Sequence, residues 1–256
     1  MTQQHKLKMV LLFLLLPLLA CALYGQQIDG SAHKKRAITD SVSRGGPRLI
    51  SRQFSFTEGP AVDRHGNVYF TDQPNNKIWK YGTDGRLSVF MDTAGRSNGM
   101  YFDRKGNLIT CADEHDQLWS VSPNRKVQVL VKDFHGARLN GPNDVWVSPK
   151  GGGIYFTDPY YQRSYWKRTS PDPGIKGEYV YYLPQHDTVP VAVVEDLVKP
   201  NGIIGSPDGK WLFVADIQAN KIWKYRIARD GTLADKRLFA NQGADGMTID
   251  RKGDIY

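Results

Sequence analysis

Residues 138–159 read RLNGPNDVWVSPKGGGIYFTDP, and this stretch contains the unit from which the rest of the chain is built. Within it, Val145 and Val147 alternate with positions of the opposite face, which is the period of a half-buried strand. Residues 149–153 supply the proline and the glycines of a tight turn. Residues 154–157 then form a second apolar run, which an Asp-Pro pair ends. The stretch therefore predicts a loop, a short strand, a turn and a second strand.

The same unit recurs along the chain, because a polar turn that ends in glycine repeatedly joins two apolar runs. The turn glycines are Gly66, Gly106, Gly151, Gly209 and Gly253. Their spacings are 40, 45, 58 and 44 residues. Three of these spacings match a propeller blade of about 40–50 residues. The longest spacing contains a polar, proline-rich insertion at residues 162–177, which we interpret as a loop.

Further short apolar runs lie between the copies, so that each unit has four short strands. These runs are residues 77–81, 87–90, 117–121, 127–131, 221–225 and 237–239. No stretch shows a sustained helical period. The pattern predicts an all-β fold, a six-bladed β-propeller with its inner strands around a central channel. A β-sandwich is the alternative, but a sandwich does not require a fixed repeat length.

The propeller domain is expected at residues 50–256, after a linker at residues 26–49. The fifth unit has only begun where the sequence ends, because its second strand stops after Gly253-Asp254-Ile255-Tyr256. We therefore expect the propeller to be truncated at its C-terminus in this chain.

The N-terminal residues have the pattern of a targeting segment. Lys6 and Lys8 precede an apolar run at residues 9–20, which is too short to span a bilayer comfortably. We interpret residues 1–25 as a signal peptide. The Leu-Leu-Ala-Cys sequence that ends at Cys21 also resembles a lipobox, and Cys21 would then carry a lipid anchor. Both alternatives predict export to the periplasm or the medium, and no other stretch is apolar enough to span a membrane.

Composition and charge are those of an ordinary globular domain. The chain is 40% apolar and 23% charged, with a formal charge of +8. A basic balance without a basic patch or motif does not indicate a nucleic-acid partner. Cys21 and Cys111 are the two cysteines and have no zinc-like spacing. We expect Cys111 to be a buried strand residue that forms no disulfide.

Polar side chains stand just before the first strand of every unit, next to glycine or proline. In the opening stretch these are Asn140, Asn143 and Asp144, which are costly to bury unless something binds them. The equivalent positions in the chain are Glu58, Asn98, Asn143, Asn201 and Asp245. Asn-Gly and Asp-Gly are common turn dipeptides, so each residue alone also has a turn interpretation. The recurrence at the same step of each unit favours a shared site.

A propeller would bring the equivalent positions together around one end of its channel. We expect Glu58, Asn143, Asn201 and Asp245 to converge there. Two carboxylates and two amide oxygens make a hard, all-oxygen site that suits one divalent cation. Ca²⁺ is the first candidate, and Zn²⁺, Mn²⁺ and Mg²⁺ are the alternatives.

Four motifs in this order resemble the SMP-30/gluconolactonase/luciferin-regenerating-enzyme-like family of six-bladed propellers. They are Glu-Gly-Pro at Glu58, Asn-Asp at Asn143, Asn-Gly at Asn201 and Asp-Gly-Met at Asp245, and the resemblance covers residues 50–256. It implies that these four side chains hold a cation that polarises a lactone carbonyl, and that Asp245 helps to activate a water molecule. The resemblance therefore implies a metal-dependent hydrolase of a sugar lactone or a similar cyclic ester, with a small-molecule substrate.

Four further residues are candidates for substrate contact. They are Arg138, Asn98, His115 and Tyr160. The motif around His115 departs from the family pattern, so that a surface-loop histidine is the alternative there, and packing is the alternative for Tyr160. Two other functions stay open: a phosphotriesterase-like or aryl-esterase-like hydrolase with the same metal site, and a non-catalytic ligand-binding propeller. The sequence does not separate the two hydrolases, because fold and metal site do not set the substrate.

Overall fold

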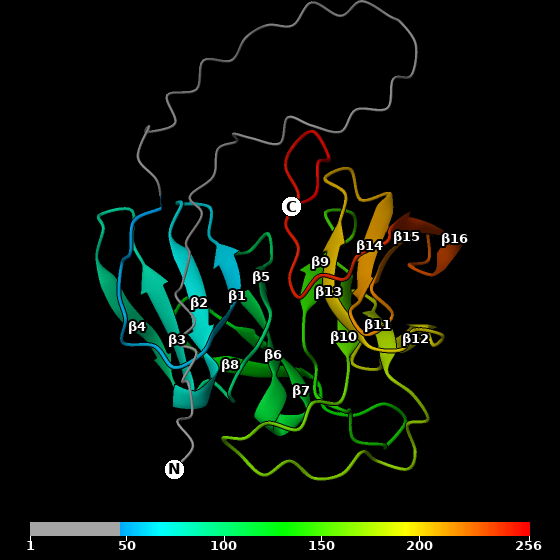
Figure 1. Cartoon of the computed structure of the whole chain (residues 1–256), viewed down its shortest axis with the longest axis horizontal. Helices are drawn as coiled ribbons and strands as arrows, with labels where there is room; N and C mark the ends of the chain where they lie inside the picture. Colours follow the sequence, from blue (N-terminus) through cyan, green and yellow to red (C-terminus); the bar gives the residue numbers. More distant parts are fainter. Residues whose placement is uncertain (1–46) are drawn as a thin grey trace, which may run out of the picture. The chain divides into compact units, whose positions relative to one another are not determined.

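The computed structural model describes residues 47–256, and the predicted all-β fold is confirmed for them. Their strands form four antiparallel sheets of four strands each, a propeller-like arrangement (Figure 1). Two single-turn 3₁₀ segments, η1 (Gln73–Asn75) and η2 (Asp113–His115), are the helical elements of this part of the chain. The predicted signal peptide and residues 26–46 of the predicted linker lie outside the described residues. Within residues 47–256, no helix has the length and apolar character of a membrane span.

Each sheet uses four strands that are consecutive in the chain, so that every sheet is one copy of the predicted unit. The first two sheets contain β1 (Thr57–Val62), β2 (Val68–Asp72), β3 (Lys77–Tyr81) and β4 (Leu87–Asp92), then β5 (Met100–Phe102), β6 (Leu108–Ala112), β7 (Gln117–Val121) and β8 (Val127–Val131). The other two contain β9 (Val145–Val147), β10 (Ile154–Asp158), β11 (Tyr179–Leu183) and β12 (Val191–Val194), then β13 (Pro200–Gly205), β14 (Trp211–Asp216), β15 (Lys221–Ile227) and β16 (Leu233–Ala240).

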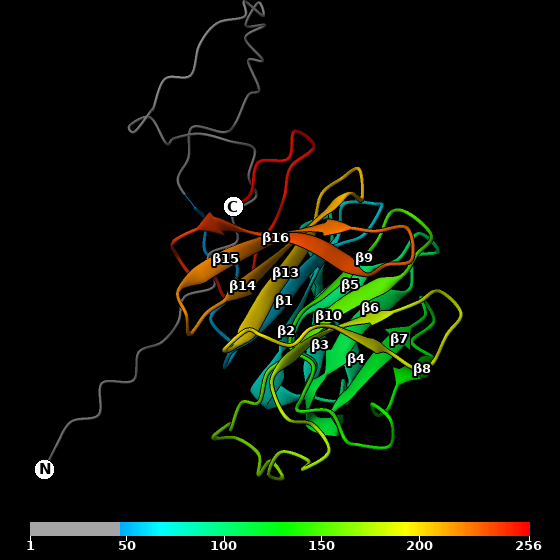
Figure 2. The same ribbon diagram turned by 90° about the vertical axis from the view of Figure 1, so that its right-hand side faces the viewer.

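The sheets contact one another mainly through their first strands. β1 contacts β5, β5 contacts β9, and β9 contacts β13. Figure 1 shows β4 and β16 on opposite sides, with these first strands between them. Residues 55–256 form one compact unit in this way. The long loop between β10 and β11, residues 159–178, contains no strand or helix, as predicted, and lies at one end of the unit (Figures 1 and 2).

Apolar side chains fill the space between neighbouring sheets. Tyr69 and Met100 belong to the cluster between the first and second sheets. Cys111 is fully buried in the next cluster, which confirms the expected place of this residue, and it forms no disulfide. Trp146 and Tyr155 pack against the fourth sheet, where Gly205 leaves room for the Trp146 indole.

One carboxylate fixes the turn between the first two strands of a unit. Asp63 accepts the backbone N–H groups of His65 at 2.8 Å and Asn67 at 2.9 Å, while Gly66 adopts a φ of +84° that favours glycine. The equivalent carboxylates in two other units are Asp103 and Asp250. The turn at Asp250 begins a fifth unit, in which Ile249 pairs with Ile255.

A second carboxylate ends the second strand in three of the sheets and holds the segment that leads into the first strand. Asp158 accepts the backbone N–H groups of Asn140 at 2.9 Å and Gly141 at 2.8 Å. Asp72 and Asp216 do the same for residues 55–56 and 198–199. Antiparallel pairing brings the end of one strand beside the start of the other, so the carboxylate satisfies two amides that the ladder leaves unpaired. We call these three residues the clamp aspartates.

We expect Asp158→Ala to lower the free energy of unfolding of the full chain by about 2–4 kcal/mol, because two backbone N–H donors lose their buried acceptor. Chemical denaturation measures the change. Asp92→Ala is the control, since the carboxylate of Asp92 makes an exposed ion pair with Lys77, and it should cost less than about 1 kcal/mol. Equal losses in the two variants would contradict a clamp role.

Candidate functional site

The polar residues that precede the first strands lie next to one another in the order of the sheets. We call Glu58, Asn98, Asn143, Asn201 and Asp245 the rim residues. Gly59 is so close to the carbonyl of Asn98 that a Cβ atom there would overlap it. The Gly99 amide donates to the Asn143 carbonyl at 2.6 Å, and Thr157 Oγ1 donates to the Asn201 carbonyl at 2.8 Å.

The rim continues to the fifth unit. A Cβ atom on Gly202 would lie 2.6 Å from the carbonyl oxygen of Asp245. Three of the four steps around the rim are therefore close backbone contacts, at Gly59, Gly99 and Gly202, where no side chain fits. The step from Asn143 to Asn201 is made through the side chain of Thr157.

Carboxyl groups gather at the rim. Burial, together with the nearby carboxylates of Asp245 and Asp144, raises the pKa of Glu58 to about 8. Burial also raises the pKa of Asp144 to about 7, although the carboxylate of Asp144 accepts the N–H groups of Val145 at 2.9 Å and Ile203 at 3.0 Å. Carboxylates in this setting favour the approach of a cation.

Two rim amides are buried without a hydrogen-bond partner among residues 47–256. Asn98 and Asn143 are 3% and 5% exposed, and neither side chain makes a hydrogen bond within this part of the chain. Asn201 donates from Nδ2 to the hydroxyl of Tyr161 at 3.0 Å, which leaves its amide oxygen open. The side-chain atoms of these three residues are not among the fully buried unpaired polar atoms of residues 47–256, so the amide oxygens are accessible to a ligand.

The rim donor set fits a hard cation. Glu58 and Asp245 supply carboxylates, and Asn143 and Asn201 supply amide oxygens, which are the donors that Ca²⁺ prefers. No three His, Cys, Asp or Glu side chains of residues 47–256 are arranged to hold a metal ion. The predicted set does not depend on such a group, because half of its donors are amides. The ligand role of these four residues stays a prediction.

Not every polar residue before β9 belongs to this donor set. Asn140 donates from Nδ2 to the carbonyls of Asp158 at 3.1 Å and Gly177 at 2.9 Å. It therefore holds the loop 159–178 against β10. Asp144 is bonded to β13, as described above. Of these three polar residues, Asn143 is therefore the one whose side chain makes no hydrogen bond within residues 47–256.

The other predicted substrate contacts lie away from the rim contacts just described. Arg138 forms an ion pair with Asp116 at 3.0 Å. His115 is exposed in η2 and stacks on Trp119, with ring centroids 5.1 Å apart. Tyr160 is half-buried, and its hydroxyl donates to Gln162 at 3.2 Å. Their substrate roles stay predictions, as does that of Asn98, which lies on the rim.

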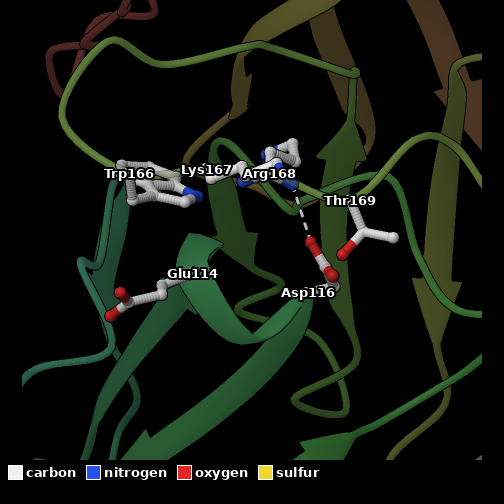
Figure 3. A pocket seen from close by; sticks show the side chains of 6 residues that line it. All are labelled: Glu114, Asp116, Trp166, Lys167, Arg168 and Thr169. Atoms are coloured by element: carbon white, nitrogen blue, oxygen red, sulfur yellow. Dashed lines mark hydrogen bonds and ion pairs between the residues drawn. The ribbon is translucent and has the colours of Figure 1, made fainter.

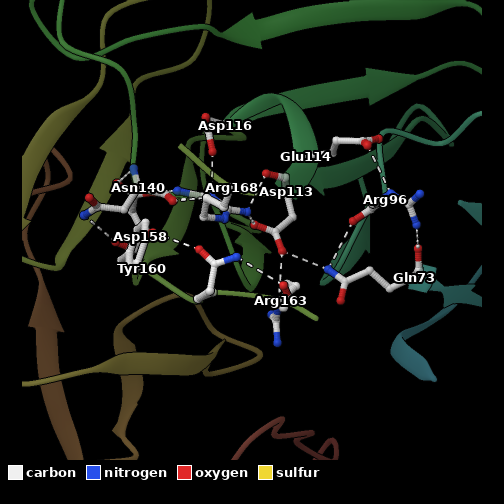
Figure 4. A network of polar contacts seen from close by, with 12 residues as sticks. Gln73, Arg96, Asp113, Glu114, Asp116, Asn140, Asp158, Tyr160, Arg163 and Arg168 are labelled. Carbon is white, nitrogen blue, oxygen red and sulfur yellow. Dashed lines mark hydrogen bonds and ion pairs between the residues drawn. The ribbon is translucent and has the colours of Figure 1, made fainter. Parts of the chain in front are cut away.

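The charged residues of the loop 159–178 were not predicted as part of the site. Figure 4 shows Arg168 among Asp113, Asp116 and Asn140. The guanidinium group of Arg168 is nearly fully buried, pairs with Asp116 at 2.6 Å, and contacts Asp113 and the carbonyl of Asn140. In the sequence, the signal for this contact is a shift of one residue: β6 ends in Ala112, where the other second strands end in a clamp aspartate. Asp113 is thus left to bind the loop.

The loop also reaches the first and fourth sheets. Tyr165 contacts the side chain of Gln73 through its hydroxyl, and Gln73 Nε2 donates to Asp113 at 2.9 Å. Tyr161 contacts Asn201 on the rim, as noted above. Arg163 lies over the Tyr161 ring, 4.7 Å from guanidinium carbon to ring centroid. Tyr161, Tyr165 and Arg168 thus fasten the loop to three sheets.

A hollow of about 270 Å³ lies beside Arg168 (Figure 3). It is lined by Glu114, Asp116, Trp166, Lys167, Arg168 and Thr169. No rim residue lines it. The Asp116 carboxylate at its wall is already paired with Arg168 and Arg138. We therefore place the candidate site at the rim and not in this hollow.

Comparison with known proteins gives a consistent assignment. The family model for the SMP-30/Gluconolactonase/LRE-like region matches residues 56–256. The gluconolactonase of Zymomonas mobilis is 28% identical over 237 residues, which cover 81% of this chain and 65% of that protein. The chain thus spans slightly less than two thirds of the length of this relative.

Solved structures agree. The gluconolactonase of Xanthomonas campestris is 28% identical, with a TM-score of 0.74 over 80% of this chain and 70% of that one. The calcium-binding protein regucalcin of Agrobacterium tumefaciens is 17% identical, with a TM-score of 0.60 over 79% of this chain and 66% of that one, and this likeness is one of fold.

We expect Gly99→Ala to lower the free energy of unfolding by about 1–3 kcal/mol, because the added methyl group overlaps the side chain of Asp144 and lies 2.6 Å from the carbonyl of Asn143. Gly246→Ala is the matched control, since Gly246 also follows a rim residue but has open space at its Cβ position. Thermal and chemical denaturation compare the two. Equal stability would show that contact between rim segments is not tight.

Proposed function

Because the chain belongs to the SMP-30/gluconolactonase/LRE-like family, we propose that it is a metal-dependent hydrolase of a sugar lactone or a similar cyclic ester. The observation that carries this proposal is the rim, where two carboxylates meet buried amides that have no internal partner. The similarity to a gluconolactonase along 81% of the chain supports the substrate class.

The proposed cation site consists of Glu58, Asn143, Asn201 and Asp245. A divalent cation bound there would polarise the lactone carbonyl and lower the pKa of a bound water molecule. Ca²⁺ is the proposed ion, which the fold likeness to a calcium-binding protein supports. The backbone contacts of the rim hold these side chains in place without help from the ion.

Asp245 is proposed as the general base. It is exposed, whereas Glu58 is partly buried, so Asp245 is the rim carboxylate that water reaches most readily. Its carboxylate accepts a proton as the water oxygen adds to the carbonyl carbon. The ester C–O bond of the ring then breaks, and the proton passes to the departing ring oxygen. The product is the open hydroxy acid.

The buried amide of Asn98 is proposed to orient the substrate. Its side chain has no internal partner among the described residues, and amide groups hydrogen-bond well with sugar hydroxyls. We also propose that the four sheets and the unit that begins at Ile249 are consecutive blades of a six-bladed ring. The targeting pattern of residues 1–25 supports a further proposal, that the protein is exported.

We expect Glu58→Gln to weaken Ca²⁺ binding by about 10–100-fold, because one of only two charged donors is lost. Titration calorimetry of the full chain, with Zn²⁺, Mn²⁺ and Mg²⁺ in parallel, measures the affinity. Glu195→Gln is the control, because Glu195 is exposed between β12 and β13. Unchanged affinity in Glu58→Gln, or no binding by the parent protein, would remove the cation site.

We expect Asp245→Asn to lower kcat for gluconolactone hydrolysis by about 10²–10⁴-fold at saturating cation, since the amide cannot accept the proton. The parent protein, assayed with cation and then with EDTA, gives the baseline and should lose its activity on chelation. Turnover of Asp245→Asn near that of the parent would leave Asp245 at most a ligand. Equal rates with and without EDTA would exclude the metal-dependent reaction.

A further inference from the structure

The loop 159–178 holds one arginine beside the rim without using its hydrogen-bond donors. The loop is fastened on both sides of Arg163. On one side Tyr161 contacts Asn201, and on the other Arg168 lies in the acidic cluster of the second sheet (Figure 4). The Arg163 side chain is 16% exposed. Its position is therefore set by the loop anchors.

The other three arginines near the loop all donate hydrogen bonds from their guanidinium groups. Arg168 and Arg138 pair with Asp116, and Arg96 donates to Glu114 and to the carbonyl of Pro74. Arg163 differs, because none of its guanidinium nitrogens makes a hydrogen bond within residues 47–256. The buried Nε of Arg168 is unpaired like that of Arg163, but both Nη atoms of Arg168 are bonded.

The one ion pair of Arg163 in this part of the chain is long. Its Nε lies 3.5 Å from Oδ2 of Asp113. That carboxylate is already used, since Oδ2 accepts from Gln73 and Oδ1 contacts Arg168. Asp113 therefore balances part of the charge of Arg163 but does not satisfy its donors, and the cost of leaving them unpaired is expected to be met by a ligand.

The surroundings of Arg163 fix the orientation of its guanidinium group and place that group beside the rim. Its guanidinium group stacks over the ring of Tyr161, whose hydroxyl is bonded to the rim residue Asn201. Its charge also acts on Glu58, whose pKa it lowers against the effect of burial. A planar guanidinium group held by an aromatic ring, with free donors, binds a carboxylate through two parallel hydrogen bonds.

We propose that Arg163 forms an anion subsite beside the rim, which takes a carboxylate of the ligand. The inference rests on the proposed lactone hydrolysis at the rim. Two sources of this carboxylate share the chemistry: a lactone that carries a second carboxylate, or the hydroxy acid that forms when a neutral lactone opens. In the first case Arg163 selects acidic lactones, and in the second it holds the product.

The test compares Arg163→Gln with Lys167→Gln, which removes the same charge from an exposed position of the same loop. The probes are gluconolactone, which is neutral, glucarolactone, which carries a carboxylate, and gluconate, the open acid. KM is measured for the two lactones, and Kd for all three probes by calorimetry at saturating Ca²⁺. Loss of a charged hydrogen bond is expected to cost about 10–100-fold.

An increase of that size in KM and Kd for glucarolactone, with the values for gluconolactone changed less than about 3-fold, assigns the subsite to an acidic substrate. The same increase for gluconate alone assigns it to the product. Arg163→Lys should lie between the parent and Arg163→Gln, because it keeps the charge and loses the fork. Equal effects on all three probes, or effects no larger than those of Lys167→Gln, would overturn the proposal.

Two readouts separate this inference from the proposed function. If no lactone is hydrolysed by the parent protein, the hydrolase assignment fails while the calorimetric comparison still tests the subsite. If the parent hydrolyses lactones and Arg163→Gln binds both carboxylate probes as the parent does, the subsite fails alone. Denaturation curves of Arg163→Gln and Arg163→Lys show whether the positive charge of Arg163, which lies beside Asp113, contributes to the stability of the fold.

Discussion

The hydrogen bonds of the clamp aspartates are the contact on which the candidate site depends. Asp72, Asp158 and Asp216 each take two backbone N–H groups from the segment that leads into a first strand. That segment is thus fixed without the side chains of the rim residues. The amide of Asn143 stays unpaired because Asp158 holds the segment before it through the backbone of Asn140 and Gly141. The rim side chains that the fold does not need for its own hydrogen bonds are the ones proposed to bind a ligand.

The second sheet departs from this plan, and the departure creates the loop anchor. With Ala112 at the clamp position, Asp113 binds Arg168 and Gln73, and the loop 159–178 is held across the sheets. Burying an arginine with two carboxylates is costly unless the bonding is complete. The Nη atoms of Arg168 are bonded to Asp113, Asp116 and the Asn140 carbonyl, although its Nε has no partner among residues 47–256. The guanidinium group of Arg163, five residues earlier, makes no hydrogen bond within residues 47–256.

The repeat made the strands predictable, because each turn glycine and each period-2 run recurs within a narrow range of spacing. The order of the rim residues followed from the same repeat. The loop contacts could not be predicted in this way, since residues 159–178 have no period and their partners lie far away in the sequence. Asn140 and Asn143 look alike in the sequence, yet Asn140 is bonded to Gly177 and Asn143 is not. Only the fold distinguishes a residue that holds a loop from one that is open to a ligand.

The glycines of the rim have a consequence for how such a site is tuned. Gly59, Gly99 and Gly202 bring neighbouring segments into direct backbone contact, so the diameter of this opening is set by main-chain atoms. Side-chain length then becomes the free variable: exchanging Asp for Glu at a rim position moves the donor oxygen by one methylene while its anchor stays still. If the proposed cation binds at the rim, ions of different radius could be matched by changing single residues, without rebuilding the architecture.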